Sequence, residues 1–113
     1  MDYTEEVEFE WDSAKSEACF RTRRFDFKFA TRAFADSSRV VRPDFREDYG
    51  ECRFELMGAI ENRLYVVVFT HRAGRVRIIS ARKANRREVA RYANRTDENE
   101  LEDAAYGEDW SYR

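Results

Sequence analysis

Basic side chains concentrate between His71 and Arg95, and their types suit the binding of an anion. This segment contains one acid, Glu88, and nine bases: Arg72, Arg75, Arg77, Arg82, Lys83, Arg86, Arg87, Arg91 and Arg95. A guanidinium can bind two phosphate oxygens at once, and a dense cationic surface attracts phosphate, carboxylate or an acidic protein. The composition of the segment leaves all three anions open as ligands.

Strand periodicity singles out Arg77 within this segment. Alternation divides residues 75–81 into two faces, with Val76, Ile78 and Ser80 on one and Arg75, Arg77, Ile79 and Ala81 on the other. If Val76 and Ile78 point toward helices, Arg77 lies on the open face of the sheet, and Arg72 and Arg82 flank it at the strand ends. These three arginines would suit an open nucleic-acid groove. The alternative is that they only solubilise an exposed sheet face.

The bases continue into a helix that we predict over residues 84–92. It carries Arg86, Arg87 and Arg91 directly after Lys83. Glu88 lies in the same helix, so ion pairs along the helix face account for part of this charge. The excess of like charge still favours an anionic partner over simple solvation.

A polar segment before the central strands is the second candidate for chemistry. It runs from Asp44 to Glu51 and includes Arg46, Glu47, Asp48 and Tyr49. Neighbouring acids and bases can position a nucleophile and move protons. The alternative is a surface loop held by Arg–Asp pairs, with Tyr49 as a partly buried anchor.

His71 is the only histidine and therefore the obvious candidate for acid–base work near neutral pH. A single histidine at a strand end is more simply interpreted as a surface residue. The sequence has no metal-ligand cluster, no glycine-rich phosphate loop and no nucleophile elbow, so we predict no cofactor.

The elements that must position these residues follow an α+β order. We predict a short strand over residues 7–11, a helix from Ser13 that Asp12 caps, a second helix over 25–35, strands over 39–42, 52–58, 64–70 and 75–81, and the helix over 84–92. The nearly continuous apolar run over residues 64–70 predicts a central strand buried on both faces. Ala73-Gly74 predicts a tight hairpin turn. The expected fold is two N-terminal helices, an antiparallel meander of about four strands and a C-terminal helix, with the helices on one sheet face.

Composition bounds the class of protein. A chain of 113 residues with 42% hydrophobic residues suits one domain with its own core. We interpret Cys19 and Cys52 as small buried residues with reduced thiols, which suits a cytoplasmic protein. No apolar run approaches the ~20 residues of a membrane span, and no signal-peptide pattern is present.

The C-terminal region differs in charge from the rest of the chain. We divide the chain into a single domain over residues 1–93 and an acidic tail over residues 94–113, which we expect to be mobile or ordered by a partner. The tail contains seven acids and two bases. It either solubilises the protein or folds over the basic face and masks it.

Four segments together resemble one known family. They are Phe9–Asp12 with Lys15, the pattern from Asp44 to Phe54, Val67–Thr70 with Arg72, and Arg77–Ala84 with Arg87, Glu88 and Tyr92. The chain resembles the BrnT family of bacterial toxins over roughly residues 7–92, in order and in register. The segment Arg77–Ala84 is the most specific part of the resemblance.

The resemblance implies a small cytoplasmic endoribonuclease that inhibits translation as the toxin of a type II toxin–antitoxin pair, with a RelE-like α+β fold. It also implies neutralisation by a BrnA-like antitoxin that binds DNA, in a heterotetramer or a higher complex that represses its own operon. RNA is the implied substrate, and no membrane is involved.

The chain departs from the family pattern after the first helix. Cys19 stands where the family usually has asparagine, and residues 22–25 stand where it has Lys-His-Gly-Val. Arg23 thus replaces the familiar histidine, and Arg24 replaces a glycine whose usual role is a positive φ, so we expect a different turn geometry. If the histidine is needed for catalysis, the alternative function is a binding module that holds an acidic antitoxin or nucleic acid without turnover.

The implied reaction is metal-independent RNA cleavage by attack of the ribose 2′-hydroxyl on the adjacent phosphorus. We expect Arg72, Arg77 and Arg82 to bind the phosphate as its charge develops. Glu51 or Asp48 is the candidate base, and Tyr92 or Lys83 the candidate acid. We expect further contacts with the substrate from four bases: Arg46, Arg53, Lys83 and Arg87.

Overall fold

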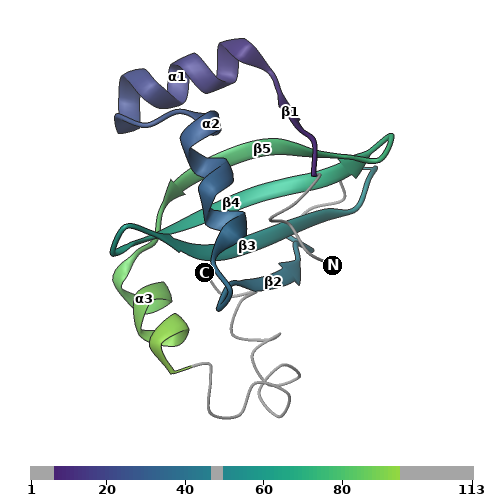
Figure 1. Cartoon of the computed structure of the whole chain (residues 1–113). Coiled ribbons are helices and arrows are strands. Elements are labelled where there is room, and N and C mark those ends of the chain that lie inside the picture. Colours follow the sequence, from purple (N-terminus) through teal and green to yellow (C-terminus); the bar gives the residue numbers. More distant parts are fainter. Residues whose placement is uncertain (1–6, 47–49, 95–113) are drawn as a thin grey trace.

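Five strands form one mixed sheet in the order β1-β5-β4-β3-β2 (Figure 1). The computed structural model describes residues 7–46 and 50–94. The strands are β1 (Phe9–Trp11), β2 (Val40–Pro43), β3 (Arg53–Ile60), β4 (Arg63–Arg72) and β5 (Arg75–Lys83). Strands β2 to β5 pair antiparallel, whereas β1 pairs parallel to β5. The predicted meander is confirmed, and β1 extends it by a fifth strand that the prediction did not include in the sheet.

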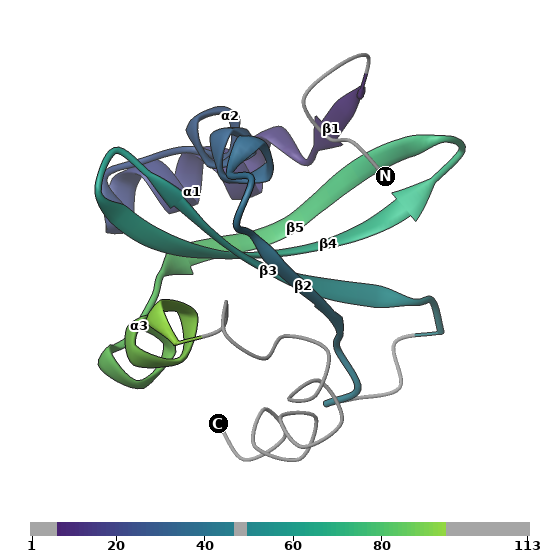
Figure 2. The same ribbon diagram turned by 60° about the horizontal axis from the view of Figure 1, so that its bottom comes forward.

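Two helices and a 3₁₀ helix cover one face of the sheet, and a third helix lies on the other side (Figure 2). The first layer consists of α1 (Ser13–Arg23), α2 (Phe27–Ala30) and the 3₁₀ helix η1 (Thr31–Ala35), and the helix on the other side is α3 (Arg86–Ala93). The expectation that all helices share one face is therefore wrong for α3. The helix predicted over 25–35 is also divided into α2 and η1.

Capping side chains set where the helices begin. Asp12 caps α1, as predicted, by accepting the backbone N–H groups of Ala14 and Lys15 at 2.8 and 3.2 Å. Asn85 and Glu88 form a reciprocal capping box at the start of α3, each side chain accepting the other residue's backbone N–H at 2.8 Å. Because of this box, α3 begins at Arg86 rather than at Ala84.

The apolar side chains form two clusters on opposite sheet faces. The first core lies under α1, α2 and η1 and includes Phe27, Phe34, Leu56, Val67, Phe69, Val76 and Ile78. The second core lies toward α3 and contains Met57, Leu64 and Val66, with Tyr92 packed against it. Residues 64–70 of β4 are all buried, which confirms the central strand. Of the two cysteines predicted to be buried, Cys19 is buried, but Cys52 is exposed.

Backbone conformation requires small residues at two places. Ala73 and Gly74 have φ angles of 54° and 79°, which confirms the tight turn between β4 and β5. Gly58 lets η1 approach β3, because a Cβ at this position would lie 2.4 Å from the Ala33 carbonyl oxygen. No helix of the described residues is both long and apolar enough to cross a membrane.

Candidate nucleic-acid interface

A β-bulge at Ile79 decides which side chains of β5 share a face. Phe69 of β4 pairs with Ile78, but the preceding Val68 pairs with Ser80, so Ile79 is extra. The alternation predicted for β5 therefore fails after Ile78, and Ser80 and Ala81 exchange the faces expected for them. The bulge also places Arg77 and Arg82 on the same face, although they are five positions apart, an odd spacing that regular alternation would put on opposite faces.

These arginines lie on the sheet face opposite α1 and α2. Val76 and Ile78 are in the first core, which confirms that Arg77 points the other way. Arg77 pairs with Thr70, and Thr70 pairs with Arg53 on the next strand, so the three form a row across the sheet. We call this surface the arginine face and define it by Arg53, Thr70, Arg77, Ser80 and Arg82.

Arg77 is held by an acid from the parallel edge strand. Glu10 of β1 is its register partner, and Arg77 Nη1 donates to Glu10 Oε2 at 3.1 Å. Both side chains are about one quarter exposed, at 26% and 27%. A guanidinium has five N–H donors, so this contact leaves several for another anion.

Glu51 links two arginines at one end of the arginine face. It accepts Arg53 Nε at 3.2 Å and Arg72 Nη2 at 3.1 Å. The hydrogen bond from Arg72, with that from Arg53, lowers the pKa of the Glu51 carboxyl below its ordinary value. Glu51 is therefore ionised at neutral pH and positioned beside Arg53 and Arg72, although a lowered pKa makes it a weaker base.

Arg82 forms a bidentate pair with a buried acid of α3. Its Nη1 and Nη2 atoms donate to Glu88 Oε1 and Oε2 at 2.9 and 2.8 Å, and the Glu88 side chain is 0% exposed. The Glu88 hydrogen bonds raise the pKa of the Arg82 guanidinium. This pair fixes the start of α3 against the end of β5 and orients Arg82.

Arg46 joins the same region from the loop after β2. It donates through Nε and Nη2 to Asp44 at 2.8 and 2.9 Å, and its Nη2 lies 3.9 Å from Glu55 Oε2. The Arg–Asp pair expected for this loop is thus present. Buried Glu55 was missed at the sequence level. The sequence could have shown its position, because residues two apart in a strand lie on the same face, and Glu55 is two residues from Arg53 in β3.

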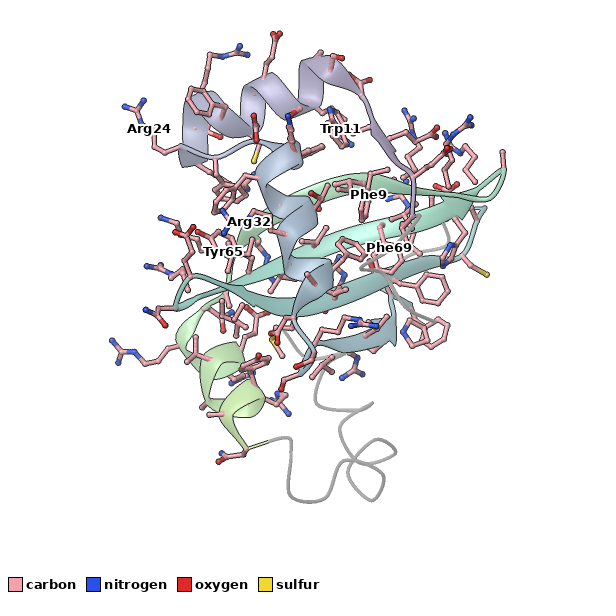
Figure 3. All side chains as sticks on the ribbon, viewed as in Figure 1. Phe9, Trp11, Arg24, Arg32, Tyr65 and Phe69 are labelled. Carbon is pink, nitrogen blue, oxygen red and sulfur yellow. The ribbon has the colours of Figure 1, made fainter. Side chains whose placement is uncertain are left out.

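A second site lies on the helix-covered side, where α1 ends near β4 and β5. It is a cavity of about 270 Å³ lined by Phe20, Arg23, Arg24, Phe25, Asp26, Phe29, Tyr65 and Lys83. We call it the edge pocket. Arg24 follows α1, and Figure 3 shows it on the same side of the molecule as Tyr65. Among the described residues, neither Arg24 nor Lys83 has an ion-pair partner for its side chain.

Comparison with known families decides the class of the protein. Residues 11–88 match a family model described as the ribonuclease toxin BrnT of type II toxin–antitoxin systems. The chain belongs to the BrnT family. No curated protein sequence matches it. The BrnT match includes the whole arginine face, Glu51 and Glu88, and it ends before Tyr92.

Arg23 and Arg24, the two residues expected to depart from the BrnT pattern, both line the edge pocket. Arg24 has a φ of 71°, the left-handed conformation that glycine favours. Arg24 therefore adopts a backbone conformation that a glycine would also favour at this position. Burial raises the pKa of the nearby Cys19 thiol, and the Arg23 guanidinium opposes that shift in part.

The candidate proton donors of this BrnT chain lie apart from the arginine row. The Tyr92 hydroxyl donates to the Asp36 carboxylate, which also accepts the Ala59 backbone N–H at 2.8 Å, so Tyr92 anchors α3. Lys83 pairs with Tyr65, whose side chain belongs to the first core, so Lys83 points away from Arg82.

Three other candidates have different surroundings. Arg87 is exposed on α3, and His71 is exposed at the end of β4, as the simpler interpretation of that histidine predicted. Asp48 lies outside the described residues. Of the nine residues predicted for the site, six lie on the arginine face or at its margin: Arg46, Arg53, Arg72, Arg77, Arg82 and Glu51. Tyr92 is bound to Asp36, and Lys83 lines the edge pocket.

Proposed function

We propose that this BrnT-family chain is a metal-independent endoribonuclease that binds the scissile phosphate of RNA at the arginine face. The observation that carries the proposal is the Ile79 bulge, which brings Arg77 and Arg82 onto one face with Arg53. Guanidinium groups held before the substrate binds can stabilise the charge that develops on phosphorus oxygens without reorganising.

Cleavage would begin with attack of the ribose 2′-oxygen on the adjacent phosphorus. The P–O2′ bond forms, the P–O5′ bond breaks, and the products are a 2′,3′-cyclic phosphate and a 5′-hydroxyl. Arg77 and Arg82 would bind the non-bridging oxygens through donors that Glu10 and Glu88 leave available. Arg53 and Arg72 would bind from the margin, where Glu51 holds them. Arg46 and Arg87 would contact flanking phosphates.

The reaction also needs a base that accepts the 2′-hydroxyl proton and an acid that protonates the 5′-oxygen. Glu51 is the candidate base, since it lies beside Arg53 and Arg72, and Asp48 is its alternative. Tyr92 would have to leave Asp36 to protonate the 5′-oxygen, and Lys83 would have to reach past the strand end. An enzyme with arginines held at the phosphate, but without an acid positioned at the 5′-oxygen, would depend mainly on stabilising the charge that develops on the phosphate oxygens.

The protein partner would be a BrnA-like, DNA-binding antitoxin that blocks the arginine face. Neutralisation in a heterotetramer or higher complex would prevent the inhibition of translation that free toxin causes in the cytoplasm. An antitoxin with an acidic segment would compete with RNA for the same arginines, because both supply anions.

The test is RNA cleavage by the purified chain freed of its antitoxin, in the presence of EDTA. Replacing Arg77 with Ala should lower the cleavage rate by roughly 100-fold or more, the usual effect of removing one preorganised donor. Arg75→Ala is the matched control, because Arg75 lies two residues away and half-exposed, where Glu8 holds it at 3.1 Å. Equal cleavage by the wild type and Arg77→Ala would refute the proposed phosphate site.

The second candidate function is a binding module without turnover. One observation favours it: the arginines of the arginine face already have carboxylate partners. The resemblance also implies that Arg23 stands where the family has a histidine. Under this alternative the purified chain binds RNA or its antitoxin, but RNA remains intact at every enzyme concentration.

A further inference from the structure

The edge pocket combines the two kinds of group that bind an unpaired nucleotide. Four aromatic side chains line it (Phe20, Phe25, Phe29 and Tyr65), together with three bases (Arg23, Arg24 and Lys83) and one acid, Asp26, so the charged groups of the lining are net positive. Phe20 is 53% exposed, so its ring is accessible to a ligand. Bases stack on such rings whatever their identity, and cations alongside bind the phosphates.

The rings in the pocket are held in fixed positions. Tyr65 meets Phe25 and Phe29 edge to face, with ring centroids 5.0 and 5.6 Å apart. The Arg32 guanidinium covers Phe29 at 5.2 Å from its centroid. Exposed Phe20 forms the remaining wall. A cavity of about 270 Å³ lies near the lower end of ligand pockets, which suits one base better than a larger ligand.

The end of β5 connects this pocket with the arginine face. Arg82 pairs with Val66 of the second core and Lys83 with Tyr65 of the first core, so consecutive residues point to opposite sides of the sheet. Their Cα atoms are only about 3.8 Å apart. Strand β1 pairs with β5 only from Val76 to Ile78. Among the described residues, no strand therefore pairs with the outer edge of β5 from Ile79 to Lys83.

We propose that single-stranded RNA bound at the arginine face passes around the end of β5 and inserts one base into the edge pocket. The base stacks on Phe20, and Arg24 and Lys83 bind the adjoining phosphates. This inference rests on the proposed function, which supplies the RNA. Charge distinguishes the two sites: the cations of the arginine face have carboxylate partners, whereas Arg24 and Lys83 have none within the described residues.

An acidic protein segment is the competing occupant of the pocket. RNA is favoured because a row of cations continues from Lys83 to Arg82 and Arg77. Such a row matches a ligand that carries one negative phosphate on every nucleotide. Four aromatic side chains around a cavity of this size also match a flat ring better than an acidic side chain.

Fluorescence polarisation with a labelled single-stranded RNA of roughly ten nucleotides tests the inference on the full chain. Phe20→Ala should weaken binding by roughly 5- to 100-fold, the range for loss of one stacked base. Phe20→Tyr should restore it, since the ring remains. Arg24→Gly should reduce the slope of log affinity against log salt by about one, as expected for one lost phosphate contact.

The controls separate a local effect from unfolding and from loss of the main site. Arg24 has a φ of 71°, so glycine fits its backbone and the fold should persist. Lys28→Gln removes an exposed positive charge from α2 outside the pocket and should leave the affinity for RNA unchanged.

If Arg77→Gln weakens RNA binding but Phe20→Ala and Arg24→Gly do not, the pocket inference is wrong and the proposed function stands. If the wild type does not bind RNA at all, the proposed function itself fails. If the pocket variants keep their affinity for RNA and lose affinity for the cognate antitoxin, the pocket is a protein-binding site, and the inference is overturned.

Discussion

The arginine face and the edge pocket use positive charge in opposite ways. On the arginine face, three acids hold the guanidiniums: Glu10 holds Arg77, Glu51 holds Arg53, and Glu88 holds Arg82. In the edge pocket, Arg24 and Lys83 have no such partner among the described residues. Paired arginines are well oriented but attract distant anions weakly, because their charge is compensated.

This difference suggests that the arginine face and the edge pocket have different roles in the handling of RNA. Fixed geometry matters most where charge develops during a reaction, and uncompensated charge matters most for capturing a polyanion. We therefore expect variants of the arginine face to affect cleavage and stability, and variants of the pocket to affect RNA affinity and its dependence on salt.

The largest effect on stability should come from the best-paired arginine. Arg82→Ala removes two hydrogen bonds to the fully buried Glu88 carboxylate, and we expect the free energy of unfolding to fall by about 3 kcal/mol or more. Urea denaturation measures this loss. Glu88→Gln is the companion variant, because glutamine preserves the capping box and leaves no buried charge. A smaller loss for Arg82→Ala than for Glu88→Gln would contradict this account of the pair.

The second-largest effect on stability should come from a substitution on the helix-covered side of the sheet, where the edge pocket also lies, rather than on the arginine face. A Cβ at Gly58 would lie 2.4 Å from the Ala33 carbonyl oxygen, so Gly58→Ala should push η1 away from β3. We expect a loss of about 1–3 kcal/mol, which is typical of overpacking. Thermal unfolding checks the value. Ala59→Gly, at the next residue on the opposite face, is the comparison for a simple change in backbone freedom.

A smaller effect of opposite sign is expected at Arg24. A non-glycine residue with a φ of 71° is strained, so Arg24→Gly should stabilise the protein by up to about 1 kcal/mol while weakening RNA binding. Unfolding and binding are measured on the same preparation. Parallel losses of stability and affinity would mean that Arg24 has a structural role rather than a ligand-binding one.

The smallest effect concerns the pH dependence that Glu51 contributes. Arg72 and Arg53 lower the pKa of Glu51 in the folded state, so its contribution is present above the ordinary pKa of 4.5 and is lost as pH falls through the folded value. The wild type should be slightly more stable than Glu51→Gln at pH 7, and the difference should vanish in acid. Melting temperatures between pH 3 and 7 measure it. A difference that grows as pH falls would have the wrong sign.

Local rules predicted much of the fold. The Asp12 cap, the turn at Ala73-Gly74 and the buried run of β4 depend on neighbouring residues, and the structure confirms each. The C-terminal helix was also predicted, but its start was predicted at Ala84, whereas α3 begins at Arg86. These features are readable because hydrophobic period and capping chemistry act over a few residues.

The candidate site was only partly predictable. Some of its features depend on neighbouring residues, and others depend on contacts between segments far apart in the chain. Arg77 was assigned to the correct face by its position next to buried Val76 and Ile78. The pairing of Arg77 with Glu10 and of Arg72 with Glu51 was not predicted, because these partners are 67 and 21 positions apart in the sequence. The edge pocket was missed for the same reason, since α1, α2, β4 and β5 each supply part of its lining.

The sequence by itself determined the BrnT family, the α+β class and a strand with Arg77 opposite the core. Only the tertiary structure decided that Arg82 shares that face, because one extra residue at Ile79 reverses the alternation. It also decided that α3 lies on the other side of the sheet and that β1 brings Glu10 beside Arg77. A bulge and a parallel pairing are fixed by packing between distant segments, and so local patterns do not specify them.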